Sequence, residues 1–223
     1  MRIKNLSLAT IAAALALALA LASCAENLPQ RTVFQPTAHN AFVVLEAPPL
    51  PMASVTLFRR VDLQSHRFER EIVTITYAPI GGLSRLNPGS TSGVILVGHE
   101  IPPGDYAIVE VGGPIFNGQA WLCMSAASPA FHFAAGQIAI VRTNYIPGYR
   151  EQLNNRLSIG NQAVLDEFAG ARTHYPSITG DASIVAPEQI IAWPRTAPSF
   201  MQAMTRACAE PETFSAVSVV PKE

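Results

Sequence analysis

From residue 41 onward, short runs of apolar residues are separated by proline, glycine and polar turns, which is a pattern that predicts β-strands. Residues 72–77 show it most clearly, because β-branched side chains alternate there as in a strand with one buried face. Strands are expected at residues 42–45, 55–61, 68–77, 94–97, 106–109, 121–123, 131–133, 137–142 and 182–185. The hydrophobic pattern therefore predicts a mainly β protein.

Two turn sequences predict how neighbouring strands connect. Pro103 and Gly104 suit the central positions of a type II turn, since proline fixes φ near −65° and glycine tolerates a positive φ. We therefore expect the flanking strands to return antiparallel as a hairpin. The sequence Ala-Ala-Gly at residues 134–136 predicts a second hairpin within residues 130–144.

The pattern changes after residue 149. Residues 161–173 place apolar side chains at helical spacing, and Pro176 ends this segment. A second helix is expected from residue 198 or 199 through Cys208. Residues 147–223 are accordingly expected to form a small C-terminal α/β appendage of about two helices.

The N-terminus has the three parts of a secretory signal. Arg2 and Lys4 provide a positive start, residues 11–22 are an unbroken run of alanine, leucine and isoleucine, and residues 21–24 read Leu-Ala-Ser-Cys. An uncleaved transmembrane helix is the alternative, but it needs about 20 apolar residues. The run ends at Ser23, and polar residues follow directly. The sequence therefore favours a signal peptide at residues 1–23.

The last four residues of this signal resemble the lipobox of bacterial lipoproteins. In that motif small residues precede a cysteine that is acylated and becomes the new N-terminus. The resemblance implies that Cys24 carries lipid and anchors the protein to a membrane. In such lipoproteins a residue other than aspartate after the cysteine favours the outer membrane, and Ala25 follows here. Residues 24–40 contain two prolines, Pro29 and Pro36, and are expected to form a lipidated tether.

Assigning Cys24 to lipid leaves Cys123 and Cys208. An even number of cysteines in an oxidising compartment is typical of a disulfide, and pairing of these two is the simplest interpretation. Two free thiols, or a metal or redox pair, are the alternatives, although metal thiolates usually come as close pairs.

Composition excludes several classes of function. Without residues 1–23 the chain has 13 basic and 16 acidic residues, a formal charge of −3, and no cluster of lysine and arginine. Nucleic-acid binding, which requires such a cluster, is therefore not expected. A content of 49% hydrophobic and 14% charged residues is far from that of disordered chains. The length of the mature chain indicates one domain, with or without an appendage.

A fold-level resemblance covers about residues 41–146. Residues 100–106 read Glu-Ile-Pro-Pro-Gly-Asp-Tyr, and residues 131–138 read Phe-His-Phe-Ala-Ala-Gly-Gln-Ile. This pair of motifs resembles carboxypeptidase-regulatory-like, or prealbumin-like, β-sandwich domains, which uncharacterised Gram-negative lipoproteins often carry. The resemblance implies an antiparallel β-sandwich and no particular activity. The expected organisation is a signal peptide (1–23), a tether (24–40), a sandwich domain (41–146) and a C-terminal helical appendage packed on the sandwich (147–223).

The sequence contains no local catalytic or metal-binding motif. No two of the five histidines are spaced as metal ligands on one strand or helix, and His132 lies between two phenylalanines, which predicts an exposed or hydrogen-bonded side chain. No catalytic residue, metal or cofactor is therefore predicted. Four aromatic residues in the irregular C-terminal part form a candidate partner surface, unless they cover an open face of the sandwich: Tyr145, Tyr149, Tyr175 and Trp193.

These observations lead to two hypotheses of function. The first is a non-enzymatic envelope lipoprotein, anchored to the membrane and facing the periplasm, which binds an envelope protein or supports an assembly. The second is a periplasm-facing hydrolase or small-ligand-binding protein, which requires several His, Asp or Glu side chains converging in one pocket. The sequence favours the first.

Overall fold

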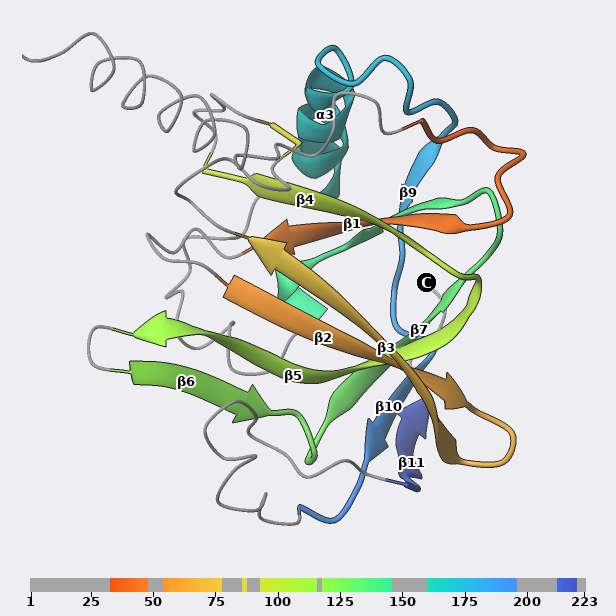
Figure 1. The fold of residues 1–223 in the computed structure, drawn as a ribbon, viewed down its shortest axis with the longest axis vertical. Coiled ribbons are helices and arrows are strands. Elements are labelled where there is room, and N and C mark those ends of the chain that lie inside the picture. The colour runs from red at the N-terminus through yellow and green to blue at the C-terminus, as the bar shows by residue number, and fades with distance from the viewer. Residues whose placement is uncertain are drawn as a thin grey trace, which may run out of the picture.

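The computed structural model describes residues 33–47, 54–77, 86–87, 93–115, 118–145, 160–195 and 212–219. As predicted, the protein is mainly β: two sheets lie beside one α-helix, α3 (Asn161–Ala171) (Figure 1). The strands are β1 (Ala41–Ala47), β2 (Ser54–Asp62), β3 (Arg67–Tyr77), β4 (Ile95–Ile101), β5 (Gly104–Ile115), β6 (Gly118–Cys123), β7 (Ser128–Phe133), β8 (Ile138–Val141), β9 (Ala182–Ile184), β10 (Gln189–Ala192) and β11 (Ser215–Val219). A short 3₁₀ helix, η1 (Thr143–Tyr145), follows β8.

The smaller sheet has four strands in the order β4-β1-β8-β9. Strand β1 pairs antiparallel with β4, but β1–β8 and β8–β9 pair in parallel. The expectation of a purely antiparallel architecture is therefore wrong for this sheet. All seven residues of β1 are buried, which suits an apolar strand covered on both faces.

The larger sheet has the order β11-β10-β7-β5-β2-β3 and is antiparallel throughout. Strand β5 is twelve residues long, which gives it room to pair with three other strands. Along one side β5 pairs with β2, and along the other it pairs first with β7 and then with β6. The start of β5 therefore lies in the middle of the sheet.

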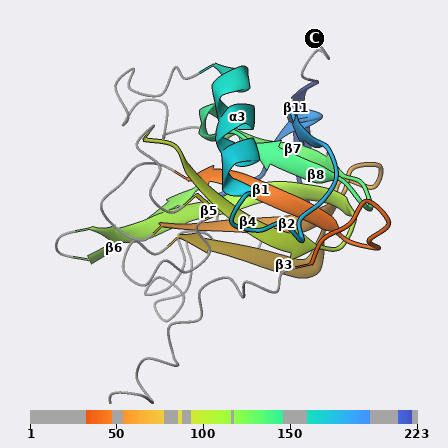
Figure 2. The same cartoon turned by 90° about the horizontal axis from the view of Figure 1, so that it is seen from above.

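Alternation along β1 builds two separate cores. Val43 and Leu45 belong to a cluster shared with the seven-stranded sheet, whereas Phe42 and Val44 belong to a second cluster with α3. On α3 the buried residues are Val164, Phe168 and Ala171, spaced at three and four residues. The four-stranded sheet is therefore a middle layer, with the larger sheet on one face and the helix on the other (Figure 2).

Both predicted hairpins are wrong, although their turns are placed correctly. Strand β4 pairs with β1 while β5 lies in the other sheet, and β7 and β8 are separated in the same way. Each turn therefore carries the chain from one sheet to the other. Burial is consistent with this placement of β8: all four of its residues are buried, with Ala139 and Val141 in the core shared with the larger sheet and Ile138 and Ile140 in the core beside α3.

The N-terminal part of the domain begins earlier than residue 41. Phe34 is 1% exposed, forms a parallel bridge with Ile178, and packs its ring 5.4 Å from that of Phe42. Residues from Val33 onward are therefore part of the fold, although residues 24–40 were expected to be a tether.

The C-terminal part is not a separate appendage of helices in its described residues. Helix α3 is confirmed within the predicted segment, and the predicted strand at 182–185 appears as β9. Strand β9 extends the smaller sheet, and β10 and β11 extend the larger one. The second predicted helix, at 198–208, lies outside the described residues.

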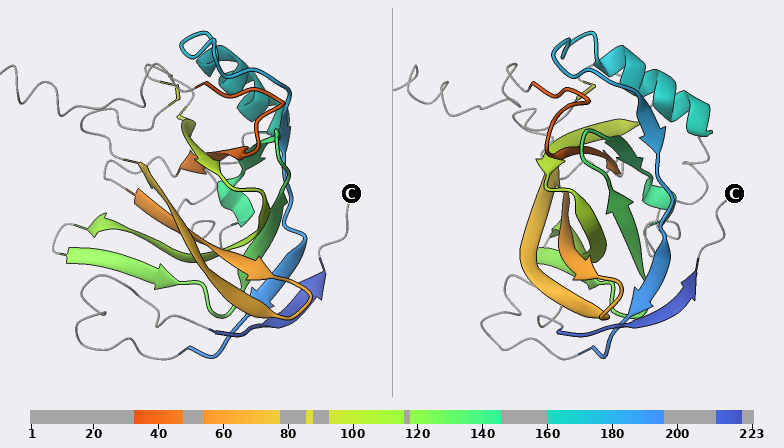
Figure 3. Two further views of the ribbon diagram at one scale, coloured as in Figure 1. Left: turned by 45° about the vertical axis from the view of Figure 1, so that its right-hand side comes forward. Right: turned by 90° about the vertical axis from the view of Figure 1, so that its right-hand side faces the viewer.

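The larger sheet curves until its two edges meet at one end (Figure 3). Arg67 at the start of β3 forms an antiparallel bridge with Thr213, just before β11. The ring of Phe68 lies 5.1 Å from Trp193 and 5.2 Å from Phe214, both edge-on, and fills the curve. Within the described residues, no helix has the length and apolar character needed to cross a membrane.

Candidate functional site: a polar cluster on strands β2, β3 and β5

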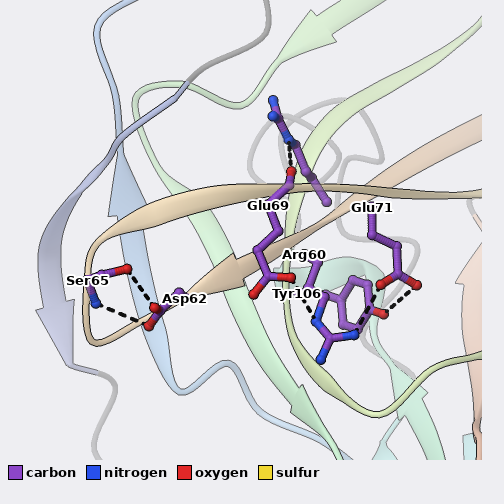
Figure 4. Close-up of polar contacts among 7 residues, drawn as sticks. Arg60, Asp62, Ser65, Glu69, Glu71 and Tyr106 are labelled. Atoms are coloured by element: carbon purple, nitrogen blue, oxygen red, sulfur yellow. Dashed lines mark hydrogen bonds and ion pairs between the residues drawn. The ribbon is translucent and has the colours of Figure 1, made fainter.

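The densest group of interacting ionisable side chains that the structure describes is centred on Arg60 of β2 (Figure 4). Its Nε lies 3.2 Å from Oε2 of Glu69, and its Nη1 lies 3.1 Å from Oε2 of Glu71. The hydroxyl of Tyr106 donates a hydrogen bond of 3.2 Å to Oε1 of Glu71. We call these four residues the Arg60 cluster.

An irregularity in strand pairing creates this cluster. Arg59 is paired with Ile72 and Val61 with Phe68, so that Arg60 alone stands opposite three residues of β3. A bulge of this kind re-aims side chains that a regular ladder would direct elsewhere. It allows two carboxylates of one strand to reach one guanidinium of the next. On the other side of β2, Arg60 is paired with Tyr106 of β5.

Gly104 provides the space in which the guanidinium lies. A Cβ atom at this position would stand 3.1 Å from Nη2 and 3.2 Å from Cζ of Arg60. The φ angle of Gly104 is +146°, which side chains other than glycine rarely adopt. The turn glycine predicted from the sequence thus also accommodates the Arg60 cluster.

The cluster shifts the pKa values of two of its members. Burial, followed by the nearby charge of Glu71, raises the pKa of Tyr106 to about 12. The phenol therefore remains protonated at neutral pH and acts as a hydrogen-bond donor. The hydrogen bond to Glu71 raises the pKa of Arg60. Arg60 carries one positive charge and faces the carboxylates of Glu69 and Glu71, so the cluster has a net charge of −1.

A second polar pair crosses from β5 to β7. Asp105 and His132 are paired in the sheet, and Nδ1 of the imidazole lies 2.7 Å from Oδ1 of the carboxylate. The side chain of His132 is 51% exposed, while Phe131 and Phe133 on either side are buried. The prediction of an exposed, hydrogen-bonded His132 is confirmed.

A third polar group is buried in the core. Nε of Arg142 donates to Oε2 of Glu46 at 2.6 Å, and the two side chains are 4% and 2% exposed. Nη1 of Arg142 donates to Oδ1 of Asn161, the first residue of α3, at 2.7 Å. This Glu46–Arg142–Asn161 network joins β1 and the end of β8 to the first residue of α3.

These groups join side chains from neighbouring strands. The Arg60 cluster and the Asp105–His132 pair consist of side chains that satisfy one another. Among the residues that the structure describes, no group of three or more His, Cys, Asp or Glu side chains is arranged to hold a metal ion.

The predicted cysteine sites are described only in part. Cys123, at the end of β6, is disulfide-bonded. Cys24 and Cys208 lie outside the described residues. The lipid on Cys24 and the pairing of Cys123 with Cys208 therefore stay predictions.

The candidate aromatic surface is not assembled in the described residues. Tyr175 is 7% exposed in the core beside α3, whereas Trp193 is 6% exposed in the other core. Tyr145 packs its ring edge-on against Phe131 at 6.2 Å. Tyr149 lies outside the described part of the chain. These rings were a candidate partner surface, with cover for an open face of the sandwich as the alternative, and the three that are described pack against the interior.

The Arg60 cluster and the buried Glu46–Arg142 pair were not predicted. Glu69 and Glu71 fall in the predicted strand at residues 68–77, but the bulge that turns them to Arg60 leaves no mark in the sequence. Arg142 directly follows an apolar run and could have drawn attention for that reason. Comparison of the chain with protein-family models, with curated proteins and with solved structures finds no match.

Proposed function

We propose that the chain is an exported bacterial lipoprotein, anchored through lipid on Cys24 to the outer membrane and facing the periplasm. Its domain acts as a non-enzymatic interaction or structural module of the envelope. The observation that carries the proposal is the position of Cys24, at the end of an apolar run and shortly before Phe34, where the chain joins the domain. This is the arrangement that a lipid-anchored domain requires.

The finer fold assignment, a prealbumin-like β-sandwich, belongs to the same proposal. It is supported by the core that both sheets share and by the two motifs at residues 100–106 and 131–138, each of which spans a crossing between the sheets. The parallel pairs around β8 are a departure from a purely antiparallel sandwich.

The proposal of a non-enzymatic role is supported by the polar groups themselves. In the Arg60 cluster the guanidinium is bound by both carboxylates, and the phenol is held protonated. An acid or base poised for catalysis needs a pKa near the working pH. A group shifted to about 12 is better suited to a stabilising hydrogen bond.

Substitution of Cys24 tests the anchor. Cys24→Ala should move the full chain from the membrane fraction to the soluble fraction and abolish incorporation of a radiolabelled fatty acid. Ser23→Ala is the matched control, because a small residue still precedes the cysteine, and it should remain lipidated. Retention of Cys24→Ala in membranes, with no soluble form, would contradict the proposal.

A further inference from the structure

The chain joins the domain at one surface, which three segments build together. These segments are residues 33–40, 134–137 and 177–181, and we call their surface the entry face. In Figure 1 they lie on the right-hand side, around the start of β1 and the turn between β7 and β8. They come from three distant parts of the sequence, so the entry face is a property of the folded domain.

Hydrogen bonds fix the entry segments to one another. The N–H of Phe34 donates to the carbonyl of Ser177 at 3.0 Å, and the carbonyl of Phe34 accepts from the N–H of Thr179 at 2.8 Å. The N–H of Gly136 donates to the carbonyl of Asn40 at 2.9 Å. The point at which the chain enters is thus fixed by the fold itself.

Chain length restricts how far this point can be from a membrane. The segment from Cys24 to Phe34, even fully extended at roughly 3.3–3.6 Å per residue, spans at most about 36 Å. A domain of the size of residues 33–223 has a radius of gyration of about 16 Å and a diameter of about 40 Å. A chain attached at the entry face is therefore too short to pass along the domain and hold its far end against the bilayer.

We propose that the entry face lies against the lipid surface and that the opposite ends of the strands point away from it. This inference rests on the proposed lipid anchor at Cys24. It assigns the membrane as the partner of the entry face and leaves the distal end of the sheets available to other envelope components.

Charge on the entry face indicates what holds it there. None of the three segments contains lysine or arginine, and their only ionisable side chains are His39 and Asp181. Attraction of basic residues to anionic lipids therefore cannot supply the contact. The short segment between Cys24 and Phe34 holds the entry face near the bilayer instead, so the orientation of the domain should not depend on salt concentration.

Two exposed threonines provide a matched pair of probes. Thr37 lies on the entry face, whereas Thr76 lies near the end of β3, a strand about 30 Å long that runs away from the end where β5 begins. Thr37→Cys and Thr76→Cys are introduced separately into the full lipidated chain and labelled with the same fluorophore. Labelled wild-type protein gives the background from its own cysteines. Vesicles of phosphatidylethanolamine and phosphatidylglycerol carry a quencher on the lipid headgroup.

The expected result is severalfold stronger quenching at residue 37 than at residue 76, unchanged between low and high salt. A flexible insertion of twenty residues after Gln30 should remove most of this difference. Equal quenching at residues 37 and 76, in protein that does sediment with the vesicles, would overturn the proposed orientation and leave the proposed lipid anchor intact. A difference in quenching that disappears at high salt would do the same. Failure of both proteins to sediment with vesicles would overturn the anchor, and the orientation with it.

Discussion

Replacement of Arg142 by alanine should destabilise the domain strongly, because it leaves the carboxylate of Glu46 in a site from which water is excluded. The two side chains are 4% and 2% exposed, and their charged atoms are 2.6 Å apart. Breaking a buried ion pair by removing one partner costs about 3–5 kcal/mol. In a domain of this size, that loss corresponds to a decrease in Tm of roughly 6–20 °C, at about 2–4 °C per kcal/mol.

A double substitution distinguishes the loss of the ion pair from the loss of packing. Glu46→Leu together with Arg142→Met removes both charges and keeps much of the volume. Such replacement of a buried pair by apolar residues is often neutral, or stabilising by about 1–4 kcal/mol. The double variant should therefore recover most of the stability that Arg142→Ala loses.

Equilibrium urea unfolding, followed by far-UV circular dichroism in a Cys24→Ala background, measures these differences. The slope of the free energy of unfolding against urea must remain constant among the variants for the comparison to hold. Arg142→Lys is the conservative control. It keeps the charge but not the planar fork that reaches both Glu46 and Asn161, and it should fall between wild type and alanine. A cost below about 1 kcal/mol for Arg142→Ala would refute the reasoning, because that is the range of exposed pairs.

Three further predictions concern other parts of the domain. Gly136→Ala should destabilise the domain by more than about 2 kcal/mol, because φ is +74° and the new Cβ would stand 2.0 Å from the carbonyl oxygen of Pro36. Gly170→Ala, in open space on α3, should instead stabilise it by about 0.5–1 kcal/mol. Similar urea midpoints for the two variants would contradict this pair of expectations. Tyr106→Phe should lower stability by about 1 kcal/mol at neutral pH through loss of a hydrogen bond. The raised pKa of Tyr106, about 12 against an ordinary value of 10, means that the folded state keeps a proton that the unfolded state loses. Its contribution is present below pH 10 and is lost as the pH rises towards 12, so urea midpoints measured from pH 9 to 11 should fall more steeply in wild type than in Tyr106→Phe; parallel curves would contradict this. Cys123→Ala should lower the free energy of unfolding by about 2–5 kcal/mol through loss of its disulfide. If Cys208 is the partner, Cys208→Ala should lower it by the same amount, and the double variant by no more. Additive losses would show that the two cysteines are not paired.

The sequence predicts strand positions well because burial of one or both faces leaves a local pattern. The strands at 42–45, 55–61 and 68–77 appear at these places as parts of β1, β2 and β3, and the helix at 161–173 appears as α3. Local pattern does not reveal which strand is the neighbour. Gly104 and Gly136 mark reversals of the chain correctly, but a reversal within one sheet and a crossing between two sheets need the same turn residues.

The candidate site was less predictable than the fold, for a related reason. Arg60 meets two carboxylates because the register of β2 and β3 shifts between Arg59 and Val61. A shift of register depends on long-range packing and leaves no periodic signal. The sequence also does not reveal that Tyr175 and Trp193 are buried, because an aromatic residue in an irregular segment belongs to no periodic pattern from which burial can be inferred.

The bridge between Arg67 and Thr213 also bears on the order of events during folding. It closes the larger sheet with a segment from the end of the chain, just as Phe34, near the start, is held by a bond to Thr179, 145 residues away. Contacts of such long range are formed slowly, since the entropy of closing long loops must be overcome first. For the export proposed above, this means that the part of the domain that has crossed the membrane would lack its final closure until residues 212–219 have crossed as well.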